Sequence, residues 1–551
     1  FSKRVPSAKL ILHNDLEMKL DNTLTRQNGG FENGVNDSSS EPQNSPSHRI
    51  AGMNLEWSQD HARTSRMGGL SYFAHFLDAT GLFEDLVAGC PLFYVSNNAP
   101  KKRDVLGAIL LSVLEGHSRY AHMSSLANAE LDARTLGMEK IPCEDSIRTG
   151  LRKLTGADGS IDDSATEEWL QACFDQLCAG CLDVPWVLDI DVTVKPLYGR
   201  QEGAVLGYNP SKPGRPSHAY HSFWVGHLRL CLGVQVRPGN ETSGSFGLEP
   251  LIQWFERTPR ARWPEFVRGD IGYGTQTWML ELEAHGIHYL FKLKQTKKVK
   301  ELIALCELNS EWESTPGNWQ HCESRLQLTG WDCSRRVVVY RRVHRRKAKP
   351  DKQAKALPGT CVVQGELTEL ELLEEDSLFY EYAIYVTDLD CPASQIRALY
   401  NPRGDNENCY DELKNQWGWG GFTLKDLARS ELMARLIALI YNWWSIYIKL
   451  VDPLVAREAI TSRPMYLMHT AKVRTHQSVR TLVIFCAHTQ AKEIQRNLEQ
   501  AAERLKSWAC RTTEQLKKSS VWSHVIAHIL LHHQTIGAGK TRAPPALSSA
   551  Q

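Results

Sequence analysis

The stretch WVLDIDVTV, residues 186–194, carries the clearest strand pattern of the chain. Apolar side chains alternate there with polar ones: Trp186, Leu188, Ile190, Val192 and Val194 with Asp189, Asp191 and Thr193. A repeat of two residues predicts a β-strand with one apolar and one polar face. We therefore expect Asp189 and Asp191 to share the polar face.

The residues after this strand predict further strands and one helix. The strand-like stretches lie at about 220–226, 228–236, 265–269 and 287–294, with a helix near 275–285. Strands first, then alternating helix and strand, is the order of an RNase H-like core. We predict an α/β fold whose RNase H-like core begins with residues 184–295.

The region before the core has helical apolar spacing. Residues 53–183, for example 105–114 and 169–177, predict a helical N-terminal domain. Residues 1–52 are rich in Asn, Ser, Gly and Gln, which predicts a disordered leader, and Met53 is an alternative natural start.

The region after the core is expected to hold an insertion and more helices. Residues 296–392 include strand-like 336–341 and 380–386, which predicts a β-rich insertion. Residues 393–455 are expected to return to the core as two helices, and the apolar run within the second, 436–448, is too short to span a membrane. Residues 456–551 predict a helical C-terminal region.

Three acidic residues stand at positions typical of a metal site. Asp191 lies on the first strand, Asp270 follows the strand at 265–269, and Glu407 lies between Arg403 and Lys414. On a helix, residues 403, 407 and 414 fall within a stripe of roughly 40 degrees. We expect this helix to start just after Tyr400, with Asn401 as its cap and Pro402 in its first turn.

This motif, with two upstream aspartates on strands, resembles the DDE transposases of bacterial insertion sequences. The resemblance is closest to the IS thirteen-eighty family and its relatives in the IS four group. It runs from about residue 53 to 450 and includes residues 96–104 (SNNAPKKRD), 199–218 (GRQEGAVLGYNPSKPGRPSH) and 400–414. It implies an enzyme that cleaves DNA at insertion-sequence ends and joins the 3′ ends to target DNA by two-metal phosphoryl transfer.

The resemblance also implies the roles of the acids. Asp191 would bridge two Mg²⁺ ions, with Asp270 on one ion and Glu407 on the other, and Mn²⁺ may substitute. Carboxylate oxygens suit such hard cations. Asp189 is the alternative first ligand, although Asp191 has the Asp-x-Thr spacing of the relatives. Glu412 is the weaker alternative to Glu407, because it turns about 140 degrees from the Arg403 face.

Basic residues near these acids are candidate DNA contacts. By resemblance, Tyr400, Arg403 and Lys414 would hold a strand end. The cluster at 341–355 and the loop at 199–218 add further candidates, the loop being either a DNA contact beside the active site or a plain connector: Arg341, Arg342, Arg345, Arg346, Lys212 and Arg215. An aromatic residue could hold a flipped base, and four tryptophans remain open for this role: Trp319, Trp331, Trp417 and Trp419.

Composition adds little to this interpretation. The net charge of +1 does not indicate a polyanionic partner, and neither paired cysteine spacing nor an export signal is evident. Zinc binding by Cys178 and Cys181, or metal binding by the histidines at 524, 528, 532 and 533, is less favoured than a structural role.

The expected partners are terminal inverted repeats, target DNA and a second copy of the chain in the synaptic complex, with no membrane. The expected location is the bacterial cytoplasm, at the nucleoid when DNA is bound. A metal-dependent DNA nuclease on the same core and a non-catalytic DNA-binding relic are the alternative functions.

Overall fold

The computed structural model describes residues 48–50, 53–55, 63–156, 163–210, 212–241, 246–345, 378–510 and 517–537. The chain divides into two units, residues 1–59 and 60–551. In the first unit, β1 (His48–Ile50) pairs antiparallel with β2 (Met53–Leu55). The rest of the predicted disordered leader, 1–47 and 51–52, lies outside the described residues.

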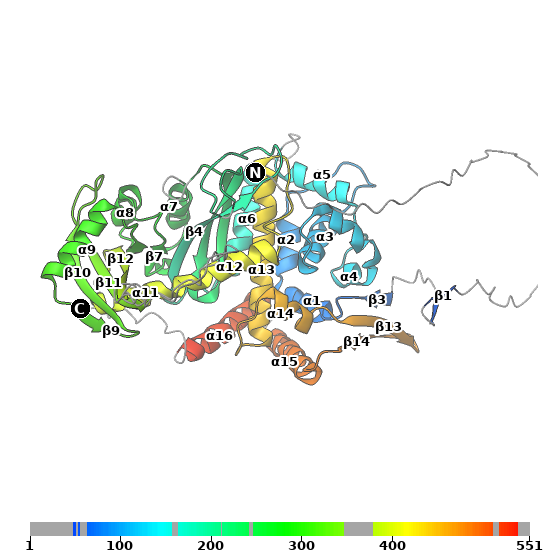
Figure 1. Cartoon of the computed structure of the whole chain (residues 1–551). Coiled ribbons are helices and arrows are strands. Elements are labelled where there is room, and N and C mark those ends of the chain that lie inside the picture. Colours follow the sequence, from blue (N-terminus) through cyan, green and yellow to red (C-terminus); the bar gives the residue numbers. More distant parts are fainter. Residues whose placement is uncertain are drawn as a thin grey trace, which may run out of the picture. The chain divides into compact units, whose positions relative to one another are not determined.

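The second unit is built on a nine-stranded sheet (Figure 1). Its order is β6-β5-β4-β7-β8-β12-β11-β10-β9, with β4 parallel to β7, β7 parallel to β8, and the other neighbours antiparallel. The strands are β4 (Val187–Pro196), β5 (Ser217–Val225), β6 (Leu230–Pro238), β7 (Phe266–Gly269), β8 (Tyr289–Lys292), β9 (Glu313–Thr315), β10 (Trp319–Leu326), β11 (Arg335–Arg345) and β12 (Leu378–Thr387).

The strands expected from the two-residue repeat are confirmed within a few residues. The segment expected as a β-rich insertion begins with α9 (Lys297–Asn309) and continues with strands. These strands extend the main sheet, because β12 pairs with β8. Residues 346–377 of this segment lie outside the described residues.

Both faces of the sheet are buried, because successive residues along its central strands belong to two different clusters of buried hydrophobic side chains. Leu188, Val267 and Phe291 belong to the cluster that includes α7 (Leu248–Arg257) and α8 (Gln276–Ala284). Their neighbours along the strands belong to a second cluster together with α11 (Ala393–Tyr400): Val187, Phe266 and Leu290. Figure 1 shows α7 and α8 on one side of the sheet and α11 on the other.

In the segment predicted as a helical N-terminal domain, residues 53–183, the described part is mostly helical. It contains α1 (Leu70–Thr80), α2 (Leu82–Gly89), α3 (Lys102–Leu114), η2 (Tyr120–Asn128), α4 (Glu130–Thr135), α5 (Glu144–Leu154) and α6 (Asp163–Cys178).

The predicted buried helix is α13 (Leu427–Val451), which packs on strand β6 at the edge of the sheet. Asn442, fully buried in α13, accepts a hydrogen bond from the backbone N–H of Cys231 at 2.9 Å and donates one to its carbonyl at 2.7 Å. Among the described residues, no helix combines the length and apolar character needed to cross a membrane.

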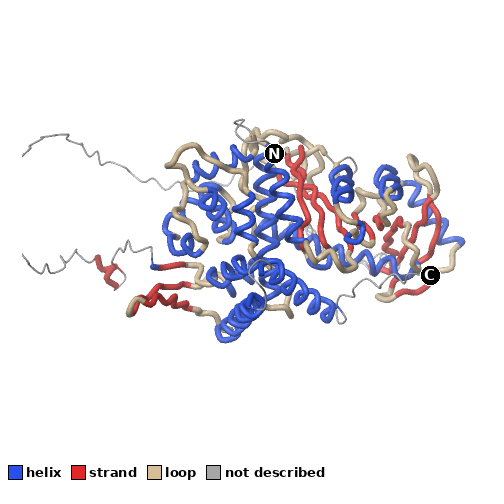
Figure 2. The backbone as a smooth tube through the Cα atoms, turned by 180° about the vertical axis from the view of Figure 1, so that it is seen from behind, coloured by secondary structure: helices blue, strands red, loops and turns tan. Residues whose placement is uncertain are grey.

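The C-terminal region was expected to be helical throughout, and this expectation is wrong in one segment. After α14 (Ala459–Tyr466), β13 (Thr470–His476) and β14 (Val479–Phe485) form an antiparallel hairpin that adds to β3 (Thr64–Ser65). Residues 477 and 478 have positive φ, which suits a tight turn. The expected helices follow as α15 (Ala491–Cys510) and α16 (Lys517–Gly537) (Figure 2).

Candidate active site

Asp191 and Asp270 lie beside each other in the sheet. The parallel register of β4 and β7 pairs Ile190 with Gly269; Asp191 is the next residue of β4, and Asp270 directly follows the end of β7. Asp191 Oδ1 accepts the N–H of Val192 at 2.8 Å, and Asp270 Oδ1 accepts that of Gly272 at 2.9 Å. Both side chains line one cavity of about 390 Å³.

The segment that carries the predicted motif crosses this cavity. Tyr400 ends α11, residues Asn401–Arg403 form the 3-10 turn η5, and α12 spans Gly404–Asn415. The prediction that a helix starts after Tyr400 with Asn401 as its cap is therefore wrong. Asn401 is itself helical, with φ −55° and ψ −38°, and Pro402 lies in the first turn of η5, where a missing N–H costs little.

Tyr400 and Arg403 line the cavity together with the two aspartates. Arg403 Nη2 donates to Asp191 Oδ2 at 2.6 Å, and its side chain is 8% exposed. Burial acts to lower the pKa of Arg403, but Asp191, Tyr400 and Asp270 together raise it above its ordinary value. The guanidinium therefore stays charged between the acids.

Tyr400 and Lys414 complete the motif around Asp191. Burial raises the pKa of Tyr400 to about 12, so its phenol stays protonated at neutral pH and can donate a hydrogen bond. Burial lowers the pKa of Lys414, and the charge of Asp191 opposes this shift.

Helix α12 contacts strand β5 at the residue that pairs with Asp191. Tyr410 hydroxyl lies 2.9 Å from Ser222 Oγ, and Ser222 faces Asp191 across the β4–β5 pair. Positions 407, 410 and 414 follow helical spacing, so the backbone of residue 407 lies on the stripe that faces the sheet. The side chain of Glu407 lies outside the described residues.

The two alternative acids have structural roles. Asp189 is 1% exposed and accepts two hydrogen bonds from Arg268, at 2.5 and 2.7 Å. Glu412 is also buried and accepts hydrogen bonds from Trp417 Nε1 at 3.0 Å and from the N–H of Ala459 at 2.9 Å. Both carboxylates are committed to protein donors away from the cavity.

Two members of the predicted basic cluster at 341–355 have described side chains, and both are paired with glutamates. Arg341 forms an ion pair with Glu307, and Arg342 with Glu381 at 2.5 Å. Arg345 ends β11, but its side chain, like the whole of residue 346, lies outside the described residues.

The loop after β4 carries the other predicted DNA contacts. Lys212 and Arg215 are exposed and lie 4.9 and 4.3 Å from the ring of Tyr198. None of the three lines the cavity.

Two cationic side chains that line the cavity were not predicted from the sequence. The choice among the four tryptophans proposed to hold a flipped base was also left open. Lys292, at the end of β8, and Arg397, one turn before Tyr400 in α11, both line it. The sequence signals that could have indicated them are the position of Lys292 at the end of a strand and the position of Arg397 three residues before Tyr400 on a helix. Of the four candidate tryptophans, Trp319 lines the cavity, with Arg397 4.0 Å from its ring, whereas Trp331, Trp417 and Trp419 are buried elsewhere.

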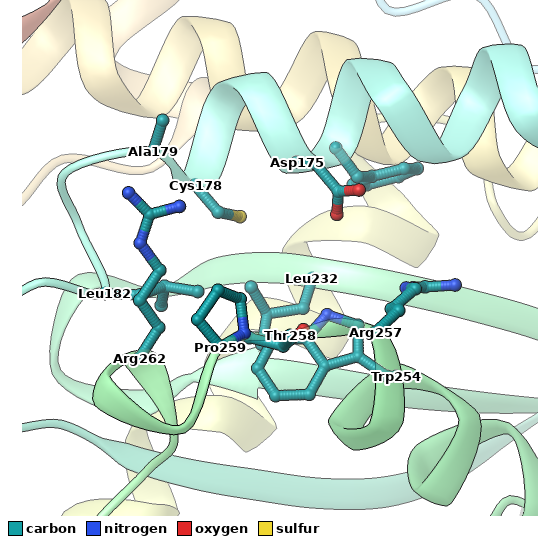
Figure 3. A pocket seen from close by; sticks show the side chains of 11 residues that line it. Asp175, Cys178, Ala179, Leu182, Leu232, Trp254, Arg257, Thr258, Pro259 and Arg262 are labelled. Atoms are coloured by element: carbon teal, nitrogen blue, oxygen red, sulfur yellow. The ribbon is translucent and has the colours of Figure 1, made fainter.

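A second cavity, of about 250 Å³, lies between α6 and α7 (Figure 3). Cys178 lines it beside Asp175, and Arg257 and Arg262 flank it. Burial raises the pKa of Cys178 well above its ordinary value, which favours a neutral structural thiol over a zinc ligand.

The carboxylates of the first cavity are suited to a hard cation. Within the side chains that the structure describes, no three His, Cys, Asp or Glu residues form a metal-binding group, and this set does not include Glu407. Asp191 and Asp270 nevertheless offer only oxygen donors in a space that also holds Arg403. This donor set fits Mg²⁺ or Mn²⁺ better than zinc or iron.

Neighbouring aspartates of two parallel strands, next to a motif segment that contributes Tyr400 and Arg403, define a candidate site of the DDE class. A family model described as transposase DDE domain group 1 matches residues 157–510, well over half of the chain, and the chain belongs to this family. No curated protein sequence matches it.

Among solved structures, a cryo-electron microscopy structure of a piggyBac transposase synaptic complex with hairpin DNA is similar at 10% identity and a TM-score of 0.35. The match covers 85% of this chain and 87% of that one. A similarity at this level does not establish a common fold.

Proposed function

We propose that this chain is the transposase of a bacterial insertion sequence of the IS thirteen-eighty family, related to the IS four group. It cleaves DNA at the ends of the element and joins the 3′ ends to target DNA. The observation that carries the proposal is the convergence of Asp191, Asp270 and Arg403 on one cavity, although they are far apart in sequence.

The sheet topology supports an RNase H-like core. In chain order, the first five strands of the sheet are arranged 3-2-1-4-5, with the first three antiparallel and the next two parallel to the first. Asp191 lies on the first of these strands and Asp270 directly follows the fourth, and these two strands are neighbours. This order therefore explains why residues 79 positions apart meet (270 − 191).

Glu407 is the proposed third acid, because its backbone lies on the sheet-facing stripe of α12. Asp191, Asp270 and Glu407 would hold two divalent ions, Mg²⁺ or Mn²⁺. When bound, such ions stabilise charge on the phosphoryl oxygens and activate the attacking water or hydroxyl.

The other motif residues, together with two further cations of the cavity, act on the DNA itself. Arg403 can grip a phosphate through two parallel N–H donors, Lys414 contributes a point charge, and Tyr400 donates its hydroxyl. Lys292 and Arg397 add positive charge to the same cavity. The proposed partners are the terminal inverted repeats, target DNA and a second copy of this chain in a synaptic complex, within the bacterial cytoplasm.

The test is strand cleavage of a duplex that carries the element's terminal repeat, with Mg²⁺. Glu407→Gln should abolish cleavage, and Glu412→Gln, on the same helix, is the matched control that should retain it. Cleavage that survives Glu407→Gln would refute the assignment of the site. Joining of the cut 3′ ends to a second duplex distinguishes a transposase from a nuclease.

A further inference from the structure

An acid-free segment lies near the C-terminus, outside the cavity. Residues 459–492 contain no Asp or Glu, although these make up 63 of the 551 residues. The hairpin of β13 and β14 lies within this segment and holds three cations: Lys472, Arg474 and Arg480. None of them lines the cavity with Asp191 and Asp270.

The two faces of the hairpin differ in chemistry. Ala471 pairs with Ile484 on one face, and Gly68 lies against both side chains, so this face is anchored on the body of the protein. Lys472 and Arg474, two residues apart on β13, lie on the other face and are exposed. That spacing separates them by about 6.8 Å along the strand.

Arg480 pairs with Thr475 near the turn, on the same face as Ala471 but at the other end of the hairpin, and it is also exposed. Among the described side chains, no ion pair to Lys472, Arg474 or Arg480 is formed. The predicted basic cluster on β11 differs in this respect, because Arg341 and Arg342 are both paired with glutamates. The hairpin therefore presents positive charge that no acidic side chain in the described part of the chain neutralises.

The hairpin also extends away from α14 and α15 (Figures 1 and 2). A two-stranded ribbon fits the major groove of duplex DNA, which is about 12 Å wide. Cations on such a ribbon can reach the phosphates beside the groove.

We infer that the β13–β14 hairpin binds duplex DNA as a ribbon, with Lys472, Arg474 and Arg480 on phosphates, at a place separate from the catalytic cavity. This inference rests on the proposed function for the identity of the polyanion. Because Lys and Arg contacts to phosphate carry no sequence information, the hairpin should bind terminal-repeat and unrelated duplexes alike.

The test compares two triple variants of the full chain by fluorescence anisotropy with a labelled duplex at several salt concentrations. One is Lys472→Gln/Arg474→Gln/Arg480→Gln. The matched control is Lys492→Gln/Arg496→Gln/Lys506→Gln, which removes three exposed cations from α15. The hairpin variant should lose roughly tenfold or more in affinity, and its salt slope should fall by about 3, whereas the control should stay near wild type.

Unchanged affinity in the hairpin variant, or equal losses in both variants, would overturn the inference. A preference of the hairpin-dependent binding for single-stranded RNA over duplex DNA would overturn it as well. None of these results touches the proposed function, which fails separately if the wild type does not cleave the terminal-repeat duplex. At saturating enzyme, the hairpin variant should still cleave, whereas Asp191→Asn should bind DNA without cutting it.

Discussion

Replacing Asp189 or Asp191 by Asn separates a structural acid from a catalytic one on the same face of β4. The Asp189–Arg268 side chains are 1% and 3% exposed. Asp189→Asn would leave the Arg268 charge buried without its partner, and the loss of one member of such a pair costs about 3–5 kcal/mol. The melting temperature should fall by about 3–5 °C.

Asp191→Asn should behave in the opposite way. Its partner Arg403 keeps Tyr400 and Asp270 nearby, and the two aspartates repel each other less after the change, so the stability cost should be smaller than that of Asp189→Asn. Cleavage should be lost. Thermal unfolding by circular dichroism and cleavage of a terminal-repeat duplex measure the two effects. An Asp189→Asn protein with wild-type stability and no cleavage would instead identify Asp189 as the metal ligand.

Three further predictions concern other parts of the chain. Asn442→Ala should destabilise the protein by about 2–4 kcal/mol in urea unfolding, because the buried N–H and C=O of Cys231 lose their partner; unchanged stability would contradict the role of this contact. Burial raises the pKa of Asp132 to about 6, so the stability that it contributes is full below about pH 4 and falls as the pH rises to 6. Asp132→Asn should therefore be more stable than wild type at pH 7, by up to about 3 kcal/mol, with no difference near pH 4. Chelation of divalent ions should abolish cleavage, and Mg²⁺ or Mn²⁺ should restore it, whereas cleavage in excess EDTA would exclude the proposed metal site.

The sequence predicted the strand of Asp191 because alternation with a period of two is a local signal. The alternation alone did not distinguish Asp191 from Asp189, which only the Asp-x-Thr spacing favoured, because the structural difference depends on Arg268, which the parallel pairing of β4 and β7 brings alongside. The cavity residues Lys292 and Arg397 were missed for the same reason, since their position depends on sheet order.

The hairpin was missed for a different reason. Most residues of β13 and β14 are exposed, so no buried face marks the strands in the sequence. The helical pattern of α15 just beyond suggested that the whole region was helical. The start of the motif helix was misplaced because Pro402 and Asn401, which suit a helix start, occur here in a turn that joins two helices.

Helix α13 affects how copies of this protein can associate. An outer strand with unsatisfied backbone groups invites a further strand from another molecule. At β6, Asn442 satisfies Cys231, and Glu431 accepts the N–H of Val236 at 3.0 Å. The edge strand β6 is therefore not available for pairing with a strand of a second molecule. Two copies of this protein would associate through another surface.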